Sequence, residues 1–464
     1  MSRTDCRGVP TSAADDAEVA AFDASLELFL NYEATAGGAL KQVLADHPTS
    51  VMTAVLRGYM MMMVESVGVR DKVAATAKAT LETGVANARE RLHLSALGLW
   101  ASGDVRAAAT VWDRLLADYP HDLLALKMHH YTTFWTGRAT ALLSAVDGVI
   151  DTWDESTPGF DHVLGMQSFA LNESGHFEQA EVIGRRAVAL NDQDLWSIHA
   201  VAHSLEMQGA LAAGDAFFDV ADDIWATKNP FVGHIWWHSA LFPWNGGNYD
   251  RVLNIYDERL RPISTEFYLD LQNLSSLLTR LELAGVDVGD RWDELGENAA
   301  SRIGDHVLTF TDVHCAMTLC RTDRRSELEA FTASLLAHRN SLPSQFHTEG
   351  LDVAIKLCRG FEDRADDRFE QAAETMLAIR DDLAPIGGSH AQRDLFELLT
   401  VDTVAATGDT AMELHLLRSR TRRWPNSVPT WTRYASALSE SGDQTGADEA
   451  NTRALQLKNQ DGAE

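Results

Sequence analysis

The sequence predicts an all-α fold in which helix–turn–helix repeats stack into an α–α superhelix. A glycine returns every 34 or 38 residues and separates an apolar helical run from a second, amphipathic run, at Gly103, Gly137, Gly175, Gly209, Gly247 and Gly285. A period of this length is typical of solenoids of helix pairs, in which neighbouring units bury one another's apolar faces. Only 11 prolines interrupt the 464 residues, and no useful stretch alternates apolar and polar residues as a strand would.

The first half of the chain shows this organisation most clearly. We predict a polar N-terminal tail over residues 1–18, an N-terminal helical section over 19–90 and regular repeats over 91–285. In the first regular repeat, an apolar stripe ends near Trp100, Gly103 turns the chain, and a second stripe ends before Pro120. Glycine supplies the backbone freedom of the turn, and proline stops the second helix.

The second half follows the same period with a less regular spacing. Residues 286–464 are predicted to form C-terminal helical repeats, in which Gly408 and Gly442 are again 34 residues apart. Between 286 and 400 the glycine register is lost, although apolar spacing of three and four residues persists. Ser389 and Gln392 match a capping box at a helix start, Asp312 is a candidate helix N-cap, and His314 is a candidate inward-facing residue.

The composition limits the classes of partner. The chain carries 68 acidic and 39 basic residues, which gives a formal net charge of −29. Because phosphate backbones and anionic lipids bind cationic surfaces, this balance predicts no nucleic-acid partner and no membrane partner. The four scattered cysteines predict no disulfide framework, and the N-terminus lacks the pattern of a secretory signal. We therefore expect a cytoplasmic protein.

Distinctive passages lie in register over most of the chain. They are DLWSIHAVAHSLEMQG (194–209), LADHPTSVMTAVLRGY (44–59), HDLLALK (121–127), FVGHIWWHSALF (231–242), GNYDRVLNIYD (247–257), FTDVH (310–314) and GGSHAQRD (387–394). In these passages the chain resembles the tetratricopeptide repeat protein 38 family. The resemblance implies a TPR-like helical-repeat protein whose biochemical activity is poorly defined at the level of the family.

Two histidine pairs in adjacent repeats are the main candidates for chemistry. His199, His203 and Glu206 fall at positions i, i+4 and i+7, and His234 and His238 are again four residues apart. At about 100° per residue, the members of each set share one helix face. We expect the two faces to line one concave pocket. Because an imidazole titrates near neutral pH and a carboxylate can orient it, His203, Glu206 and His238 are predicted to be catalytic acid–base residues.

Aromatic and polar neighbours complete the predicted pocket. Five of the 12 tryptophans fall within residues 196–244, where they would wall a cavity and exclude water. The predicted substrate-binding residues are His199, His234, Trp237, Trp196, His129, His314 and Arg393. The ligand would be a small molecule, transformed by acid–base or metal-assisted chemistry.

The histidine pairs are also conditional ligands of a divalent transition metal, since two imidazoles one helical turn apart can hold one ion. The set would be His199, His203, His234 and His238, although the sequence contains no HExxH motif. Two other interpretations stay open. The groove could present itself to a peptide or partner protein, as extended solenoid surfaces do, or the histidines could bridge helices in a scaffold without chemistry. The sequence leaves ligand identity and oligomeric state undetermined.

Overall fold

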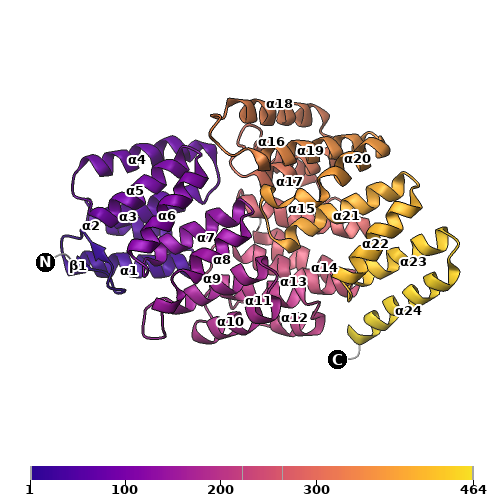
Figure 1. The fold of residues 1–464 in the computed structure, drawn as a ribbon, viewed down its shortest axis with the longest axis horizontal. Coiled ribbons are helices and arrows are strands. Elements are labelled where there is room, and N and C mark those ends of the chain that lie inside the picture. The colour runs from indigo at the N-terminus through magenta and orange to yellow at the C-terminus, as the bar shows by residue number, and fades with distance from the viewer. Residues whose placement is uncertain (1–2, 222, 264, 462–464) are drawn as a thin grey trace. The chain divides into compact units, whose positions relative to one another are not determined.

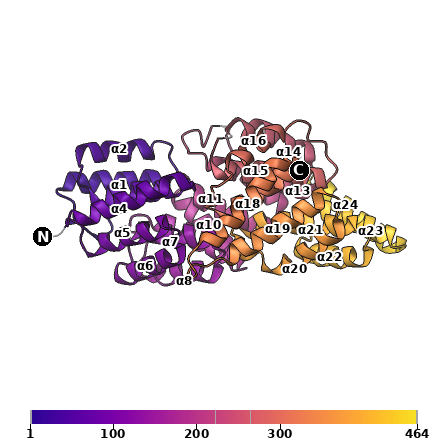
Figure 2. The ribbon, with the colours of Figure 1, turned by 90° about the horizontal axis from the view of Figure 1, so that it is seen from above.

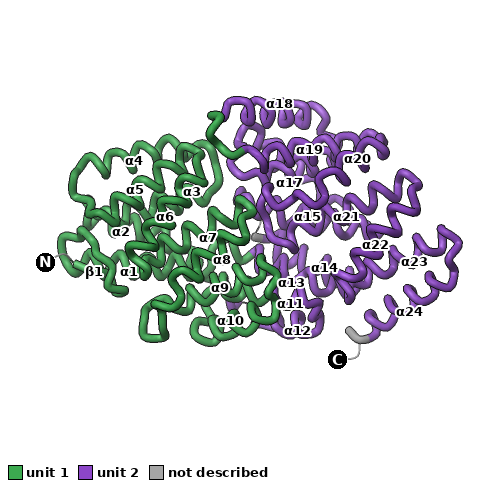
Figure 3. The backbone as a smooth tube through the Cα atoms, viewed as in Figure 1, with its two compact units in different colours: residues 1–201, 225–232, 343–347 green, residues 202–224, 233–342, 348–464 purple. Residues whose placement is uncertain are grey.

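The computed structural model of the chain describes residues 3–221, 223–263 and 265–461, which form an all-α helical-repeat fold with one two-residue strand pair (Figure 1). The chain divides into two compact units (Figure 3). Unit 1 comprises Met1–Val201, Trp225–Val232 and Pro343–His347, and unit 2 comprises Ala202–Ile224, Gly233–Leu342 and Thr348–Glu464. The three sections predicted from the sequence, 19–90, 91–285 and 286–464, remain a prediction, since the two units divide the chain by a different criterion.

The first elements, all in unit 1, are β1 (Arg3–Thr4), β2 (Pro10–Thr11), α1 (Asp16–Leu30), α2 (Ala36–Asp46), α3 (Val51–Met62), α4 (Arg70–Glu82), α5 (Ala88–Ala101), α6 (Val105–Asp118), α7 (Leu123–Trp135), α8 (Ala139–Asp147), α9 (Phe160–Glu173) and α10 (Phe177–Leu190). Helix α11 (Leu195–Met207) contains residues of both units. Short 3-10 turns cover Val67–Val69 and Ile150–Thr152.

The later elements are α12 (Leu211–Phe217), α13 (Val232–Gly246), α14 (Tyr249–Ile255), α15 (Tyr268–Leu283), α16 (Asp293–Ser301), α17 (Thr309–Arg321), α18 (Arg325–Ser341), α19 (Glu349–Ala365), α20 (Phe369–Ile379), α21 (His390–Ala406), α22 (Thr410–Arg423), α23 (Val428–Glu440) and α24 (Gln444–Asp461). A π-turn covers Tyr256–Leu260, and 3-10 turns cover Arg261–Ile263, Arg380–Asp382 and Ala384–Ile386. Consecutive helices pack in pairs; α23 and α24, for example, lie side by side in Figures 1 and 2.

The predicted turn glycines are confirmed as the joints of the helix pairs. All six glycines of the 34–38-residue series, and Gly408 and Gly442, adopt positive φ angles between 65° and 92°. The loss of the regular glycine spacing between residues 286 and 400 has a simple cause. At the equivalent turns, Asp323 between α17 and α18 and Asp367 between α19 and α20 take positive φ values of 52° and 57°. Aspartate is one of the few other residues that visit this region readily, because its short side chain bonds locally.

The two helices of a pair differ in burial. All 13 residues of α7 and 14 of the 16 residues of α15 are buried, whereas only three of the 14 residues of α10 are. A helix buried on every side cannot expose its polar residues to water, so these must find partners inside the protein. Unit 2 supplies such partners by curving back on itself, because α15 packs against both α17 and the much later α21.

A buried network of hydrogen-bonded polar side chains shows the same principle in unit 1. Asp122 caps the start of α7 by accepting the N–H of Ala125, and it also accepts Nε–H of Arg89 at 2.6 Å. His93 lies 2.9 Å from the same carboxylate and 3.0 Å from the hydroxyl of Tyr59. The charge of Arg89 keeps the pKa of Asp122 well below its usual range despite complete burial. These hydrogen bonds join α3, α5 and α7.

The first residues differ from the predicted polar tail. Strands β1 and β2 pair in antiparallel register, and the Asp5 carboxylate accepts the backbone N–H groups of Arg7 and Val9. Arg7 then donates to the carbonyl oxygen of Pro158 at 3.1 Å. These long-range contacts order a segment that composition alone describes as polar. Helix α21, in contrast, begins as predicted, with a capping box between Ser389 and Gln392.

Replacement of Asp122 by Asn should lower the free energy of unfolding by about 3 kcal/mol, because the buried Arg89 loses its nearest counter-charge and keeps only the more distant Asp5 at 3.9 Å, while the helix cap is kept. The measurement is urea denaturation followed by circular dichroism. Asp118→Asn is the control, since Asp118 is exposed and pairs with the exposed Arg114 at 4.0 Å. Equal stability of the two variants would contradict this role of Asp122.

Candidate functional site

Unit 2 collects three of the predicted imidazoles into one buried cluster. His203 comes from α11, and His234 and His238 come from α13. The ring of His238 lies 4.4 Å from that of His203 and 4.8 Å from that of His234, measured between centroids. His234 stacks on Trp237 at 5.2 Å with the planes 9° apart. All four side chains belong to residues that are at most 3% exposed.

Two hydrogen bonds orient this imidazole cluster. Nδ1 of His238 lies 3.2 Å from Oε2 of Glu206, which comes from α11 one turn after His203. His234 donates Nδ1–H to Oδ1 of Asn273 on α15 at 2.8 Å. The predicted acid–base residues His203, Glu206 and His238 therefore lie together, and Asn273 is a member that the sequence did not reveal.

Burial controls the protonation of the cluster. It lowers the pKa of His203 and His238 well below the usual imidazole value, and it lowers the pKa of His234 to about 4. Burial also raises the pKa of Glu206 to about 8, an effect that Arg280 opposes and Asp394 reinforces. At neutral pH the imidazoles are therefore neutral and Glu206 carries a proton.

A buried arginine supplies a positive charge beside these neutral groups. Arg280 on α15 donates to the carbonyl oxygen of Ala391 at 2.9 Å and to Ser276. Its guanidinium lies over the ring of Trp237, 5.6 Å from the centroid. Burial lowers the pKa of Arg280 to about 10, while the charges of Asp394 and Glu206 oppose this shift. Arg280 thus remains charged at neutral pH in a site with little water.

Two hydrogen-bond donors of the cluster lack an acceptor. The indole Nε1–H of Trp237 and the amide Nδ2 of Asn273 are buried, and neither has a hydrogen-bond partner among the described residues. Buried donors without a partner are uncommon and call for an explanation, such as a bound water or ligand oxygen. These two donors and Arg280 therefore make the surroundings of the cluster rich in hydrogen-bond donors.

A small cavity adjoins the network at the start of α21. It has a volume of about 250 Å³. Its lining residues are Arg380, Asp381, Leu383, Ala384, His390, Arg393, Asp394, Glu397 and Arg423. Arg393, predicted to bind substrate, donates to the carbonyl oxygen of Gly388 and lies 3.4 Å from Nδ1 of His390. The charges of His390 and Arg393 also lower the pKa of His203, so the cavity and the imidazole cluster influence one another electrostatically.

His314 occupies a different setting in unit 2. It donates Nδ1–H to the carbonyl oxygen of Phe310 one turn earlier in α17, and its ring packs against Phe310 and Phe396. Burial lowers its pKa to about 4. His314 is inward-facing as predicted. The interpretation of Asp312 as a helix N-cap is wrong, because the cap position is Leu308 and Asp312 instead accepts Nδ1–H of His306 at 2.9 Å.

The other predicted binding residues belong to unit 1. The His199 ring stacks on Phe169 at 5.2 Å and lies 4.9 Å from Trp196. His129 pairs instead with Asp113 at 3.1 Å, and this contact lowers the pKa of Asp113. Of the ten predicted site residues, unit 1 therefore contains His199, Trp196 and His129, and unit 2 contains the other seven.

Lys127 is a buried charge in unit 1 that the sequence analysis did not single out. It is 4% exposed, donates to the hydroxyl of Tyr32 at 3.0 Å, and lies 4.3 Å from the ring centroid of Trp196. Burial lowers its pKa to about 8, while Asp194 opposes the shift. The available signal was a single charged residue in the otherwise uncharged segment 123–135.

Replacement of Lys127 by Met should raise the free energy of unfolding at pH 7 by about 2–3 kcal/mol. The pKa of Lys127 falls from 10.5 to about 8 on folding, and each unit corresponds to about 1.4 kcal/mol, partly offset by the lost hydrogen bond. Between pH 8 and 10.5 the unfolded chain binds more protons, so the wild type gains stability as pH rises through this window. Thermal unfolding at several pH values measures the effect. A less stable variant, or one with the same gain above pH 8, would contradict it.

Three solved structures are similar to the chain at low sequence identity. No family model matches the chain. The human IFIT1 dimer with m7Gppp-AAAA is 13% identical, with 96% of each chain covered and a TM-score of 0.43. A monomeric IFIT1 mutant with Gppp-AAAA is 14% identical, with 96% of each chain covered and a TM-score of 0.41. The P58(IPK) TPR domain is 12% identical over 80% of this chain and 93% of its own, with a TM-score of 0.22. The chain has a TPR-like helical-repeat fold.

The comparisons correct one prediction about partners. The acidic composition predicts no nucleic-acid partner, whereas the similar IFIT1 structures hold m7Gppp-AAAA, Gppp-AAAA and PPP-AAAA. Net charge is a property of the whole surface, whereas a ligand meets the local charge. One cavity of this acidic chain is lined by three arginines, Arg380, Arg393 and Arg423, together with three carboxylates. The exclusion of a nucleic-acid partner, which rested on net charge alone, is therefore withdrawn. As for membranes, none of the helices within the described residues is long and apolar enough to cross a bilayer.

Proposed function

We propose that unit 2 of this helical-repeat protein binds a small, oxygen-rich anionic molecule at the imidazole cluster and exchanges a proton with it. The observation that carries the proposal is the contact between Glu206, whose pKa burial raises to about 8, and His238. A buried carboxylic acid with a pKa near the working pH, paired with a neutral imidazole, is suited to general acid–base chemistry.

The geometry supports a simple proton relay. In the neutral pair, the Glu206 carboxyl O–H donates to Nδ1 of His238, and the imidazole carries its own proton on Nε2. When a basic oxygen of the ligand takes the Nε2 proton, Nδ1 receives the proton of Glu206. The products are a protonated ligand, a neutral imidazole and a carboxylate, whose charge Arg280 stabilises.

The same cluster favours a second candidate, a divalent transition metal. Metal-binding imidazoles commonly bond their second nitrogen to a carboxylate or carbonyl oxygen, which fixes the ring. His238 and His234 place Nδ1 on Glu206 and Asn273 in this manner, and low pKa values keep the rings neutral as metal binding requires. His234 and His238 on α13 would supply two of the ligands. Of the other two predicted ligands, His203 belongs to unit 2 and His199 to unit 1.

Other parts of the proposal rest on the sequence. The passages quoted above support membership of the tetratricopeptide repeat protein 38 family, and the composition supports a cytoplasmic location. The alternative function is an interaction scaffold for a peptide or protein. It would leave the orphaned donors of Trp237 and Asn273 and the raised pKa of Glu206 without a role.

Proton linkage provides the test. A thermal-shift screen of small carboxylates and phosphate monoesters selects a ligand, and calorimetric titrations in buffers of different ionisation enthalpy then count the protons exchanged on binding. We expect proton exchange in the wild type and its loss in Glu206→Gln. Glu413→Gln is the matched control, because Glu413 is 3% exposed, against 4% for Glu206, and pairs with Arg433 elsewhere in unit 2.

Three outcomes would overturn the proposal: no stabilising ligand in the panel, binding without proton exchange, or unchanged exchange in Glu206→Gln. Element analysis by mass spectrometry of protein purified without a histidine tag separates the two candidates. One metal ion per chain, lost in His234→Gln, would favour the metal site over the metal-free relay.

A further inference from the structure

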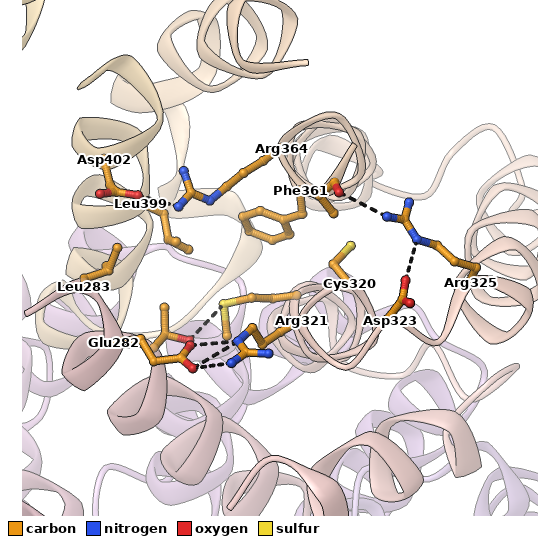
Figure 4. A pocket seen from close by; sticks show the side chains of 13 residues that line it. Glu282, Leu283, Cys320, Arg321, Asp323, Arg325, Phe361, Arg364, Leu399 and Asp402 are labelled. Carbon is orange, nitrogen blue, oxygen red and sulfur yellow. Dashed lines mark hydrogen bonds and ion pairs between the residues drawn. The ribbon is translucent and has the colours of Figure 1, made fainter. Parts of the chain in front are cut away.

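A larger cavity of unit 2 lies apart from the imidazole cluster and shares no lining residue with the smaller cavity (Figure 4). Its volume is about 500 Å³, within the range of small-molecule sites. It forms where α15, α17 and α19 end beside α21. Its lining residues are Thr279, Glu282, Leu283, Met317, Cys320, Arg321, Asp323, Arg325, Phe361, Arg364, Ala365, Leu399 and Asp402.

Part of the lining of this cavity is apolar. Leu283, Met317, Phe361 and Leu399 come from four different helices and line one space, and Figure 4 shows Leu283, Phe361 and Leu399 among the lining side chains. Cys320 lies among them, but burial raises the pKa of its thiol to about 12. The thiol therefore stays protonated and unreactive at neutral pH, so the cavity is suited to binding rather than to covalent chemistry.

Paired charges surround the apolar part of the lining. Arg321 on α17 forms a bidentate pair with Glu282 on α15, with both Nε contacts at 3.0 Å. Arg364 on α19 pairs with Asp402 on α21 and donates to Thr403 at 3.0 Å. Figure 4 shows the two pairs on separate walls of the cavity.

A third pair completes the surround: Arg325 lies 3.0 Å from Asp323 and also contacts Asp366. Three guanidinium groups are thus balanced by the three lining carboxylates Glu282, Asp323 and Asp402.

Stability alone does not account for this arrangement. The side chains of Arg321 and Arg325 are 52% and 44% exposed, and ion pairs at such positions contribute little to the free energy of unfolding. Their concentration around one partly apolar cavity is better explained by recognition of a ligand that carries both signs of charge and an apolar group. A phosphate or other multiply charged anion fits less well, because the carboxylates would repel it.

We propose that this cavity binds a free α-amino acid with a large apolar side chain. The side chain packs against Phe361, Met317 and Leu399. The α-carboxylate pairs with Arg364 or Arg321, whose planar guanidinium groups suit bidentate carboxylate binding. The α-ammonium group pairs with Glu282 or Asp402. This site is independent of the proton relay proposed above.

Calorimetric titration of the full chain with L-phenylalanine tests the proposal. Two analogues remove one charge each: 3-phenylpropionate lacks the ammonium group, and 2-phenylethylamine lacks the carboxylate. We expect saturable binding of phenylalanine and at least tenfold weaker binding of both analogues. Absence of saturable binding by phenylalanine, leucine, methionine and tryptophan would overturn the proposal, as would equal affinity for phenylalanine and its two analogues.

Two variants assign the contacts. Glu282→Gln should weaken phenylalanine binding at least tenfold and leave the affinity for 3-phenylpropionate, which has no ammonium group, unchanged. Arg364→Gln should also weaken phenylalanine binding at least tenfold and leave the affinity for 2-phenylethylamine, which has no carboxylate, unchanged. Arg339→Gln is the matched control, since Arg339 is 39% exposed and pairs with Asp352 at 2.8 Å outside the cavity. Thermal unfolding verifies that each variant is folded. Equal loss in the control, or no loss in either cavity variant, would contradict the assignment.

Discussion

The arrangement of polar groups in this protein depends on one constraint: the first helix of many repeats is buried on nearly every side. Helices such as α7 and α15 carry lysine, arginine, histidine and asparagine, and water cannot solvate these side chains. Each must therefore pair within the protein or shift its pKa toward the neutral form. Asp122 with Arg89 shows the first solution, and the imidazole cluster of unit 2 shows the second.

The two solutions have different consequences for function. A paired ion such as Asp394, which accepts two N–H groups of Arg420 at 2.6 and 2.7 Å, is held in one charge state and serves the architecture. Within the part of the chain that the structure describes, Glu206 has no such strong counter-ion at hydrogen-bond distance; burial raises its pKa, and it shares a hydrogen bond with the imidazole of His238. Groups whose pKa is moved toward neutrality in this manner are the ones suited to acid–base work.

The fold could be predicted from the sequence to a large extent, because repetition fixes it. The turn glycines stand at the predicted joints, since the left-handed φ angles strongly favour glycine there. The glycine spacing is interrupted at Asp323 and Asp367, because aspartate adopts the positive φ angle of the turn there. The hairpin over residues 3–11 was also missed, because its main contact, from Arg7 to the carbonyl of Pro158, spans 151 residues.

The candidate site was predictable only in part. Spacing along a helix placed His203 beside Glu206, and the repeat period brought His238 to both. Asn273, Arg280 and Lys127 could not be identified, because their significance comes from burial and from partners far along the chain. Composition averages the charge of the whole chain, so it does not reveal the arginines that line a single cavity.

The central claim, that unit 2 buries its three imidazoles in the neutral form, is tested most directly by nuclear magnetic resonance of protein with ¹⁵N-labelled histidine. The account predicts that the ring nitrogens of His203, His234 and His238 keep the shifts of neutral imidazole from pH 8 down to about 5, because desolvation lowers all three pKa values. Titration of these rings with midpoints near that of a free imidazole, about 6.5, would contradict it.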